Sequence, residues 1–214
     1  IWIKTMVGFQ GAPKFPQFYV FDTIFYFYSK NKNKTFFEVT EKLLKNICSK
    51  GIYDQLGGGI SRYTVDDKWV IPHFEKMLYD NILFVRLLNF YVENTKDKYF
   101  KSKLLQSINF IHQEFHNKDN LLGSAYDADS DGVEGKYYIW KYQHLKNILK
   151  EKFELFKKKY EVSEIGNFEG CNILVERSEN ILKENELEDI KQMENKLLSE
   201  RAKRVKPFST TKVK

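Results

Sequence analysis

The stretch WVIPHFEKMLYDN, Trp69 to Asn81, places a histidine, a glutamate, a lysine, a tyrosine and an aspartate among strongly apolar side chains. Pro72 is typical of a first helical turn, and the apolar spacing after it predicts a helix over 73–94. A surface helix gathers its polar residues on one face, whereas a core helix excludes them. This stretch does neither cleanly, so its polar residues need a separate explanation.

Three of these polar side chains, His73, Lys76 and Asp80, fall near one line of the predicted helix, while Glu75 and Tyr79 lie four residues apart on its flank. One interpretation is an ordinary capped helix start with surface pairs, and the spacing alone favours it. The other is a pocket wall, in which histidine and carboxylates act as acid and base.

The rest of the chain reads mainly as helices. Residues 14–30 are aromatic on more than one face, which predicts a buried helix. Apolar stripes predict further helices over 35–50 and 97–116, and 121–140 resembles a β-hairpin around an Asp- and Gly-rich turn. Long helices in pairs predict an all-α fold of stacked helical hairpins.

Composition excludes several classes of protein. The formal charge of +6 comes from Lys and Arg scattered along the chain, so we expect no nucleic-acid partner. No run approaches 18 apolar residues, so we expect no membrane span.

Cys48 and Cys171 lie far apart and read as reduced thiols of a cytoplasmic protein. Because the chain opens on Ile1, we interpret it as a piece of a longer protein.

The glycine-rich segment 51–71 holds side chains suited to a sugar: aromatic rings stack on pyranose faces, and charged planar groups take pairs of hydroxyls. An equally simple alternative is structural, with glycines supplying positive φ and the aromatics packing the loop down. Its GGG lacks the Lys-Ser or Lys-Thr of a phosphate-binding loop. The candidate sugar ligands are Tyr53, Asp54, Arg62, Tyr63 and Trp69.

Two further motifs resemble metal sites without completing them. DADSDG, 127–132, starts like a calcium loop, but its twelfth position is Tyr138 and not Glu. HQEFH, 112–116, has Gln113 where a zinc protease needs Glu. We therefore expect neither a metal nor a cofactor, and interpret Asp127 and Asp129 as polar turn residues facing the same pocket as His73.

Five stretches, in this order, resemble the thioredoxin-domain-containing, spermatogenesis-associated thioredoxin-like protein family. They span nearly the whole chain, and the PHFEKMLYDN and DADS blocks are the most specific. The stretches are GFQGAPKFP (8–16), GIYDQLGGGISRYTVDDKWVIPHFEKMLYDN (51–81), SAYDADSDGVEGKYYIW (124–140), GNFEGCNIL (166–174) and RAKRVKP (201–207).

The resemblance implies a larger protein, in which a thioredoxin-like redox domain precedes an (α/α)6 toroid similar to six-hairpin glycosidases and N-acylglucosamine 2-epimerases. Residues 1–214 would be the first part of that toroid, so the missing parts of the full-length chain are its expected partners. Loops at one end of the inner helices form the cleft of such rings. The resemblance therefore favours the pocket-wall interpretation of PHFEKMLYDN.

The resulting hypothesis is a carbohydrate-directed enzyme, either a hydrolase or an epimerase. The alternative is a non-catalytic toroid that binds a ligand or partner beside a redox domain. A hydrolase would use Glu75 or Asp80 together with Asp127, and an epimerase would use His73 as its base. The catalytic candidates are His73, Glu75, Asp80, Asp127 and Asp129. The substrate-binding candidates are Tyr53, Asp54, Arg62, Tyr63, Trp69 and Tyr79.

Two departures from the family pattern bear on this hypothesis. Relatives carry Phe-His where this chain has Ile60 and Ser61, and an Asp-Asp-Lys where it has 210–212, Thr-Thr-Lys. Both changes remove groups capable of proton transfer or ion pairing. Either the chemistry does not use them or this copy is impaired.

Overall fold

The computed structural model describes residues 11–32, 34–116, 121–178 and 182–210. This part of the chain is mostly helical, with two small antiparallel sheets. The helices are α1 (Phe18–Asn31), α2 (Lys34–Ser49), α3 (Leu78–Thr95), α4 (Lys98–Phe110), α5 (Tyr142–Leu149), α6 (Phe153–Lys159) and α7 (Glu184–Arg201). The strands are β1 (Lys76–Met77), β2 (Ala125–Tyr126), β3 (Asp129–Ser130), β4 (Val133–Glu134) and β5 (Ser209–Thr210).

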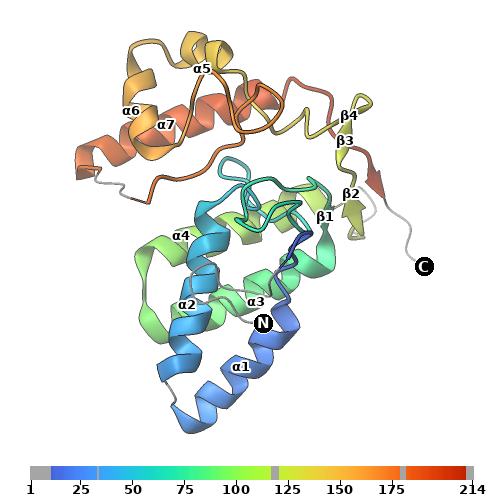
Figure 1. The fold of residues 1–214 in the computed structure, drawn as a ribbon, viewed down its shortest axis with the longest axis vertical. Helices are drawn as coiled ribbons and strands as arrows, with labels where there is room; N and C mark the ends of the chain where they lie inside the picture. Colours follow the sequence, from blue (N-terminus) through green and yellow to red (C-terminus); the bar gives the residue numbers. More distant parts are fainter. Residues whose placement is uncertain (1–10, 33, 117–120, 179–181, 211–214) are drawn as a thin grey trace.

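The helices form two groups, with the glycine-rich segment between them (Figure 1). The first group is α1 to α4, in which α1 packs on α2 and on α3, and α3 packs on α4. Its core includes Phe21, Leu44, Phe84 and Leu88, each with no measurable exposure. Burying one such side chain contributes about 1.5 to 3 kcal/mol. The helices predicted over 14–30, 35–50 and 97–116 are confirmed within a few residues at their ends, although a short π-helical turn, Ile111–Phe115, completes the last.

Helix α1 is buried on one face only, so the prediction of a helix buried on more than one face is wrong. Phe18, Phe21 and Phe25 point into the core, whereas Tyr19 and Tyr26 are more than half exposed. Both α2 and α3 contact α1, and the buried phenylalanines provide that contact surface.

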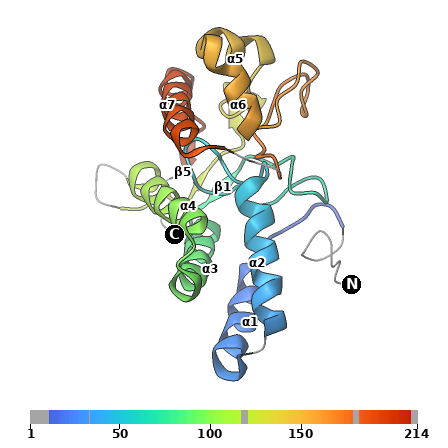
Figure 2. The same ribbon diagram turned by 90° about the vertical axis from the view of Figure 1, so that its left-hand side faces the viewer.

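The second group consists of α5, α6 and α7, and Figure 2 shows it above the first group. Its separate core is built around Trp140, Phe156 and Leu197, none of which has measurable exposure. Among the residues that the structure describes, no helix combines the length and apolar character needed to cross a membrane.

The start of α3 differs from the sequence prediction. The helix begins at Leu78 and not at residue 73, and the preceding residues are irregular or extended, with Phe74 at a φ of 62°. Pro72 bridges to Thr64 in an extended pairing, and β1 pairs with β2. Proline fixes φ for an extended segment as well as for a helix start, which explains the error. His73, Lys76 and Asp80 therefore do not lie along one helix.

Of the hairpin predicted over 121–140, only the part next to the turn is confirmed. The strands β3 and β4 pair across that turn, Asp129 opposite Glu134. Strand β2 instead lies between β1 and β5 in a three-stranded sheet, in which Ala125 faces Met77 on one side and Thr210 on the other. This sheet joins the start of α3 to the segment that follows α7.

Asn81, on the first turn of α3, fixes the glycine-rich segment to the helix. Its side chain accepts from the Ile60 amide (2.8 Å) and donates to the Ile60 carbonyl (3.1 Å) and the Met77 carbonyl (2.8 Å). Gly59, at a φ of 76°, comes so close that a Cβ there would lie 2.9 Å from the Asn81 Oδ1 atom. The segment can take this course only with glycine at that position.

We predict that Asn81→Ala lowers the free energy of unfolding by about 3 kcal/mol, because it strands buried backbone groups of Ile60. Urea denaturation measures the change. The control is Asn89→Ala, which removes an exposed amide of the same helix, bonded to Glu93, and should change stability by no more than about 0.5 kcal/mol. Equal effects of the two substitutions would contradict the proposed anchoring.

Candidate functional site

The three stretches singled out in the sequence meet next to the first turn of α3. The Arg62 amide donates to the Glu75 carbonyl at 2.8 Å, which holds the glycine-rich segment beside the residues before α3. Lys76 pairs with Tyr126 in the sheet, which brings the aspartate turn to the same region. Their candidate side chains nevertheless divide into several groups with different environments.

One cluster of candidate side chains comprises Arg62, Glu75, Tyr79 and Asp80. The Arg62 Nη1 atom lies 3.4 Å from the Glu75 Oε2 atom, in a half-buried ion pair. Two polar atoms here are buried and lack a hydrogen-bond partner among the described residues, the Arg62 Nε and the Asp80 Oδ2. Buried polar atoms are rarely left unpaired without a functional reason or a bound water.

The environment of Asp80 raises the pKa of its carboxyl group. Burial raises the pKa of its carboxyl to about 6, with Glu75 adding to the rise and Arg62 and Tyr79 opposing it. A carboxyl group with a pKa near 6 can hold a proton and release it close to neutral pH. Of the candidate residues, Asp80 thus has the property that acid–base chemistry requires.

His73 lies in a second cluster of side chains, in which an aromatic ring and a carboxylate hold its imidazole in place. Its ring stacks on Tyr63 at a centroid distance of 4.7 Å, and Tyr63 contacts Phe15 at 4.8 Å. The His73 Nδ1 atom lies 2.9 Å from the Glu134 Oε1 atom. A carboxylate on one imidazole nitrogen orients the ring and leaves the other nitrogen for a ligand.

Asp127 and Asp129 are exposed beside the small sheets. The Asp127 amide donates to the Phe208 carbonyl at 2.9 Å, and the Asp129 amide approaches Asp127 at 3.4 Å. In the described part of the chain, no hydrogen bond or ion pair joins either carboxylate to Asp80 or His73. Instead the turn reaches His73 through Glu134, which pairs with Asp129 across the hairpin.

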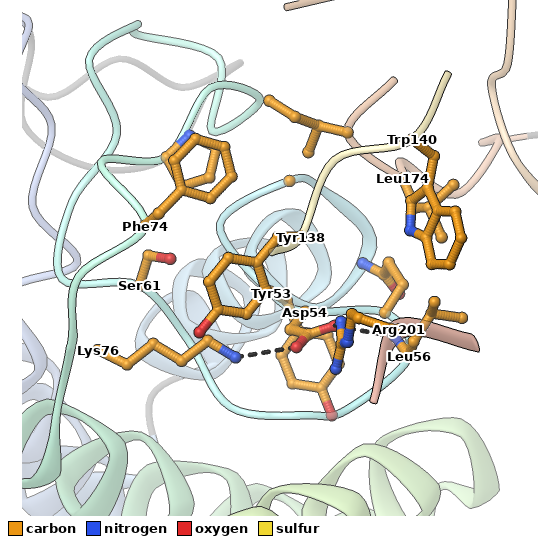
Figure 3. Close-up of a pocket in the computed structure, with 14 residues that line it drawn as sticks. Tyr53, Asp54, Leu56, Ser61, Phe74, Lys76, Tyr138, Trp140, Leu174 and Arg201 are labelled. Carbon is orange, nitrogen blue, oxygen red and sulfur yellow. Dashed lines mark hydrogen bonds and ion pairs between the residues drawn. The ribbon is translucent and has the colours of Figure 1, made fainter. Parts of the chain in front are cut away.

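Asp54 belongs to a buried ionic cluster. Its carboxylate accepts from the Lys76 ammonium at 3.0 Å and from the Arg201 guanidinium at 2.8 Å, as the dashed lines in Figure 3 mark. Burial alone would raise the pKa of Asp54, but Arg201 and Lys76 outweigh it and hold this pKa well below its usual range. The carboxylate is therefore ionised and occupied by these two cations.

Tyr53 and Trp69, two of the candidate sugar ligands, are core residues in this structure. Tyr53 has 1% of its surface exposed and Trp69 none. The Tyr53 hydroxyl donates to the Gln106 side chain at 2.8 Å, and the Lys14 ammonium lies 4.6 Å from the centre of the Trp69 ring. The structural alternative, aromatics that pack the loop down, describes both residues.

The departures from the family pattern lie in structured surroundings. Ile60 is buried against Asn81, and Ser61 faces the small cavity beside Lys76 and Asp54 (Figure 3). Thr210 pairs with Ala125, whereas residues 211 and 212 lie outside the described part of the chain.

Sequence reasoning missed Arg201 and Glu134 and misplaced Lys76. Arg201 was visible only as the first residue of RAKRVKP, and it meets Asp54 across 147 positions of sequence. The sequence pattern places Lys76 on a helix face, but the residue lies in β1 and its side chain is 2% exposed. Lysine is almost never fully buried unless it is paired. Its neighbours Glu75 and Met77 do not reveal the burial of Lys76, because its partner, Asp54, lies 22 residues away in sequence.

Comparisons with known proteins give relatives but no family model, because no such model matches the chain. An uncharacterized protein of Caenorhabditis elegans is 31% identical over 179 residues. Spermatogenesis-associated protein 20 is 28% identical in Mus musculus and 27% in Homo sapiens, over 180 residues. Each alignment covers 75% of this chain, which spans about a quarter of the relatives' length. These similarities support a relationship to the spermatogenesis-associated protein 20 family.

We predict that Asp54→Asn lowers the free energy of unfolding by about 3 to 5 kcal/mol, because it leaves two buried cations without their carboxylate. Since the pKa of Asp54 is lowered in the folded state, its stabilisation is present above the unfolded pKa of about 4 and declines below it. Urea denaturation at neutral pH and at pH 3 measures both effects. Asp131→Asn, at an exposed ion pair with Lys136, is the control and should stay within about 0.5 kcal/mol.

Proposed function

We propose, from these similarities, that the chain is part of a spermatogenesis-associated protein 20-like protein and forms the first part of a carbohydrate-directed helical toroid. The paired contacts of α1 with α2 and of α3 with α4 support the hairpin architecture. The proposed cleft lies at the start of α3, where the glycine-rich segment and the aspartate turn adjoin it. A fold alone does not fix a reaction, so the chemistry rests on the side chains.

The observation that carries this proposal is the contrast between two carboxyl groups: one has a raised pKa, and the other is held in an ion pair. Asp80, with a pKa of about 6 and an unpartnered buried oxygen, lies beside Glu75, which Arg62 holds in an ion pair. Two carboxyl groups in such different environments can divide the roles of general acid and of nucleophile or base. Asp80 is the proposed acid and Glu75 the proposed partner.

The surrounding side chains suit a polyhydroxylated ligand. Tyr79 is nearly half exposed and provides a ring for stacking, while Arg62 retains an unpartnered Nε donor. His73, oriented by Glu134, would supply the base for an epimerisation. Asp127 and Asp129 remain candidate ligands at the exposed turn, and the buried Tyr53, Asp54 and Trp69 are assigned to the scaffold.

One observation favours the alternative, a non-catalytic module that binds a ligand beside a redox domain. Three predicted substrate ligands are buried and engaged within the protein, so fewer exposed groups are left for chemistry. A module of this kind binds sugar without turnover. The test of the proposal therefore measures binding and turnover on the same panel.

We predict that the full-length protein turns over at least one member of a panel of glycosides and free hexoses, and that Asp80→Asn lowers this turnover by about a hundredfold or more. Reducing-sugar release detects hydrolysis and proton NMR detects epimerisation. If Asp80 is the acid, kcat falls as the pH rises through about 6, because the group loses its proton there. Asp189→Asn, at an exposed ion pair with Lys152, is the control.

Binding without turnover would contradict the enzyme and support the module. Turnover that survives in Asp80→Asn, with an unchanged pH profile, would remove Asp80 from the mechanism. If the protein neither binds nor turns over any sugar of the panel, the carbohydrate-directed proposal as a whole is contradicted.

A further inference from the structure

Two cavities flank Arg201, and neither is lined by Asp80 or His73. The larger has a volume of about 140 Å³ and lies between β1, β2, the end of α4 and the end of α7. The smaller, of about 30 Å³, has Arg201, Trp140 and Ser61 among its lining residues (Figure 3). Asp54 and Lys76 line both cavities. Residues lining the larger cavity include Phe110, Glu114, Tyr138 and Lys206.

Around Arg201 the buried side chains include two cations and one carboxylate, which gives an excess of one positive charge. The side chains of Lys76 and Arg201 are 2% and 5% exposed, and both share the single carboxylate of Asp54. Glu114 does not balance them, because it is one-third exposed and pairs with Lys206 at 2.9 Å. Buried charges are ordinarily paired one for one, so an excess cation in a cavity calls for a counter-ion.

The unpartnered polar atoms here are all donors. The Arg201 Nε, whose side chain lines both cavities, and the Trp140 Nε1, whose side chain lines the smaller one, are buried and without a hydrogen-bond partner among the described residues. The Lys76 ammonium donates to Asp54 and to the Gly58 carbonyl, each at 3.0 Å, which leaves a third hydrogen. Spare donors beside an excess positive charge are complementary to an oxygen ligand with negative charge.

We propose that the larger cavity binds a small oxyanion, a carboxylate or phosphate group, through Lys76 and Arg201. A water needs about 10 to 15 Å³ of such space, so 140 Å³ accommodates a group of several heavy atoms. The rings of Phe110 and Tyr138, which also line the cavity, lie with their centres 4.4 and 4.8 Å from the Lys76 ammonium.

The electrostatics of Lys76 agree with a role in anion binding. Burial lowers the pKa of this lysine, Arg201 lowers it further, and Asp54 opposes both effects. A bound oxyanion would act in the same direction as Asp54 and raise the pKa of Lys76. The Glu114 and Lys206 pair lies among the residues that line the cavity, so changing either alters the field there without removing a buried ion.

The test titrates the full chain with sodium phosphate, sodium acetate and sodium chloride at constant ionic strength. Thermal unfolding and isothermal titration calorimetry report binding. We expect a saturable rise in Tm with phosphate, acetate or both, above the chloride reference, since a ligand that binds only the folded state stabilises it. A response to acetate alone identifies a carboxylate site, and a response to phosphate alone a phosphate site.

Three variants connect such binding to this cavity. Glu114→Gln removes a competing negative charge and should tighten binding roughly two- to fivefold, whereas Lys206→Met should weaken it by a similar factor. Glu188→Gln removes an exposed charge of α7 away from the cavity lining and should leave the affinity unchanged. No difference between the oxyanions and chloride, or equal affinities in all three variants, would overturn the proposal. Either result leaves the role of Asp80 untouched.

Discussion

The arrangement of this chain depends on one buried carboxylate, Asp54, held between Lys76 and Arg201. These residues come from the glycine-rich segment, from β1 and from the end of α7, so the ion pairs connect positions 22 and 147 residues apart. A buried ion pair is often no more stabilising than a well-packed apolar group, but removal of one partner is costly. The cluster therefore specifies how α7 meets the first helical group.

Much of the fold could be predicted from sequence because the helices carry strong local patterns. The stripe of Leu43, Leu44 and Ile47 marks α2, and those residues are buried as expected. The start of α3 was misjudged because Pro72 also suits an extended segment. The sheet was out of reach because β1, β2 and β5 are two residues long and pair across large sequence separations, where no local period exists.

The candidate site was predictable in its location more than in its members. Arg62, Glu75 and Asp80 lie together because backbone pairing brings neighbouring segments side by side. Trp69 could not be recognised as a core residue, because an aromatic residue in a polar loop has the same composition signal whether it stacks on a sugar or packs inward. Arg201 and Glu134 were missed because their partners are set by the tertiary structure alone.

A double-mutant cycle on Asp54 and Arg201 tests the central role of the buried carboxylate most directly. The free energy of unfolding is measured by urea denaturation for the wild type, Asp54→Asn, Arg201→Met and the double variant. If the two side chains act as one unit, the double variant loses less stability than the sum of the single losses, by at least about 1 kcal/mol. Additive losses within about 0.5 kcal/mol would contradict this account.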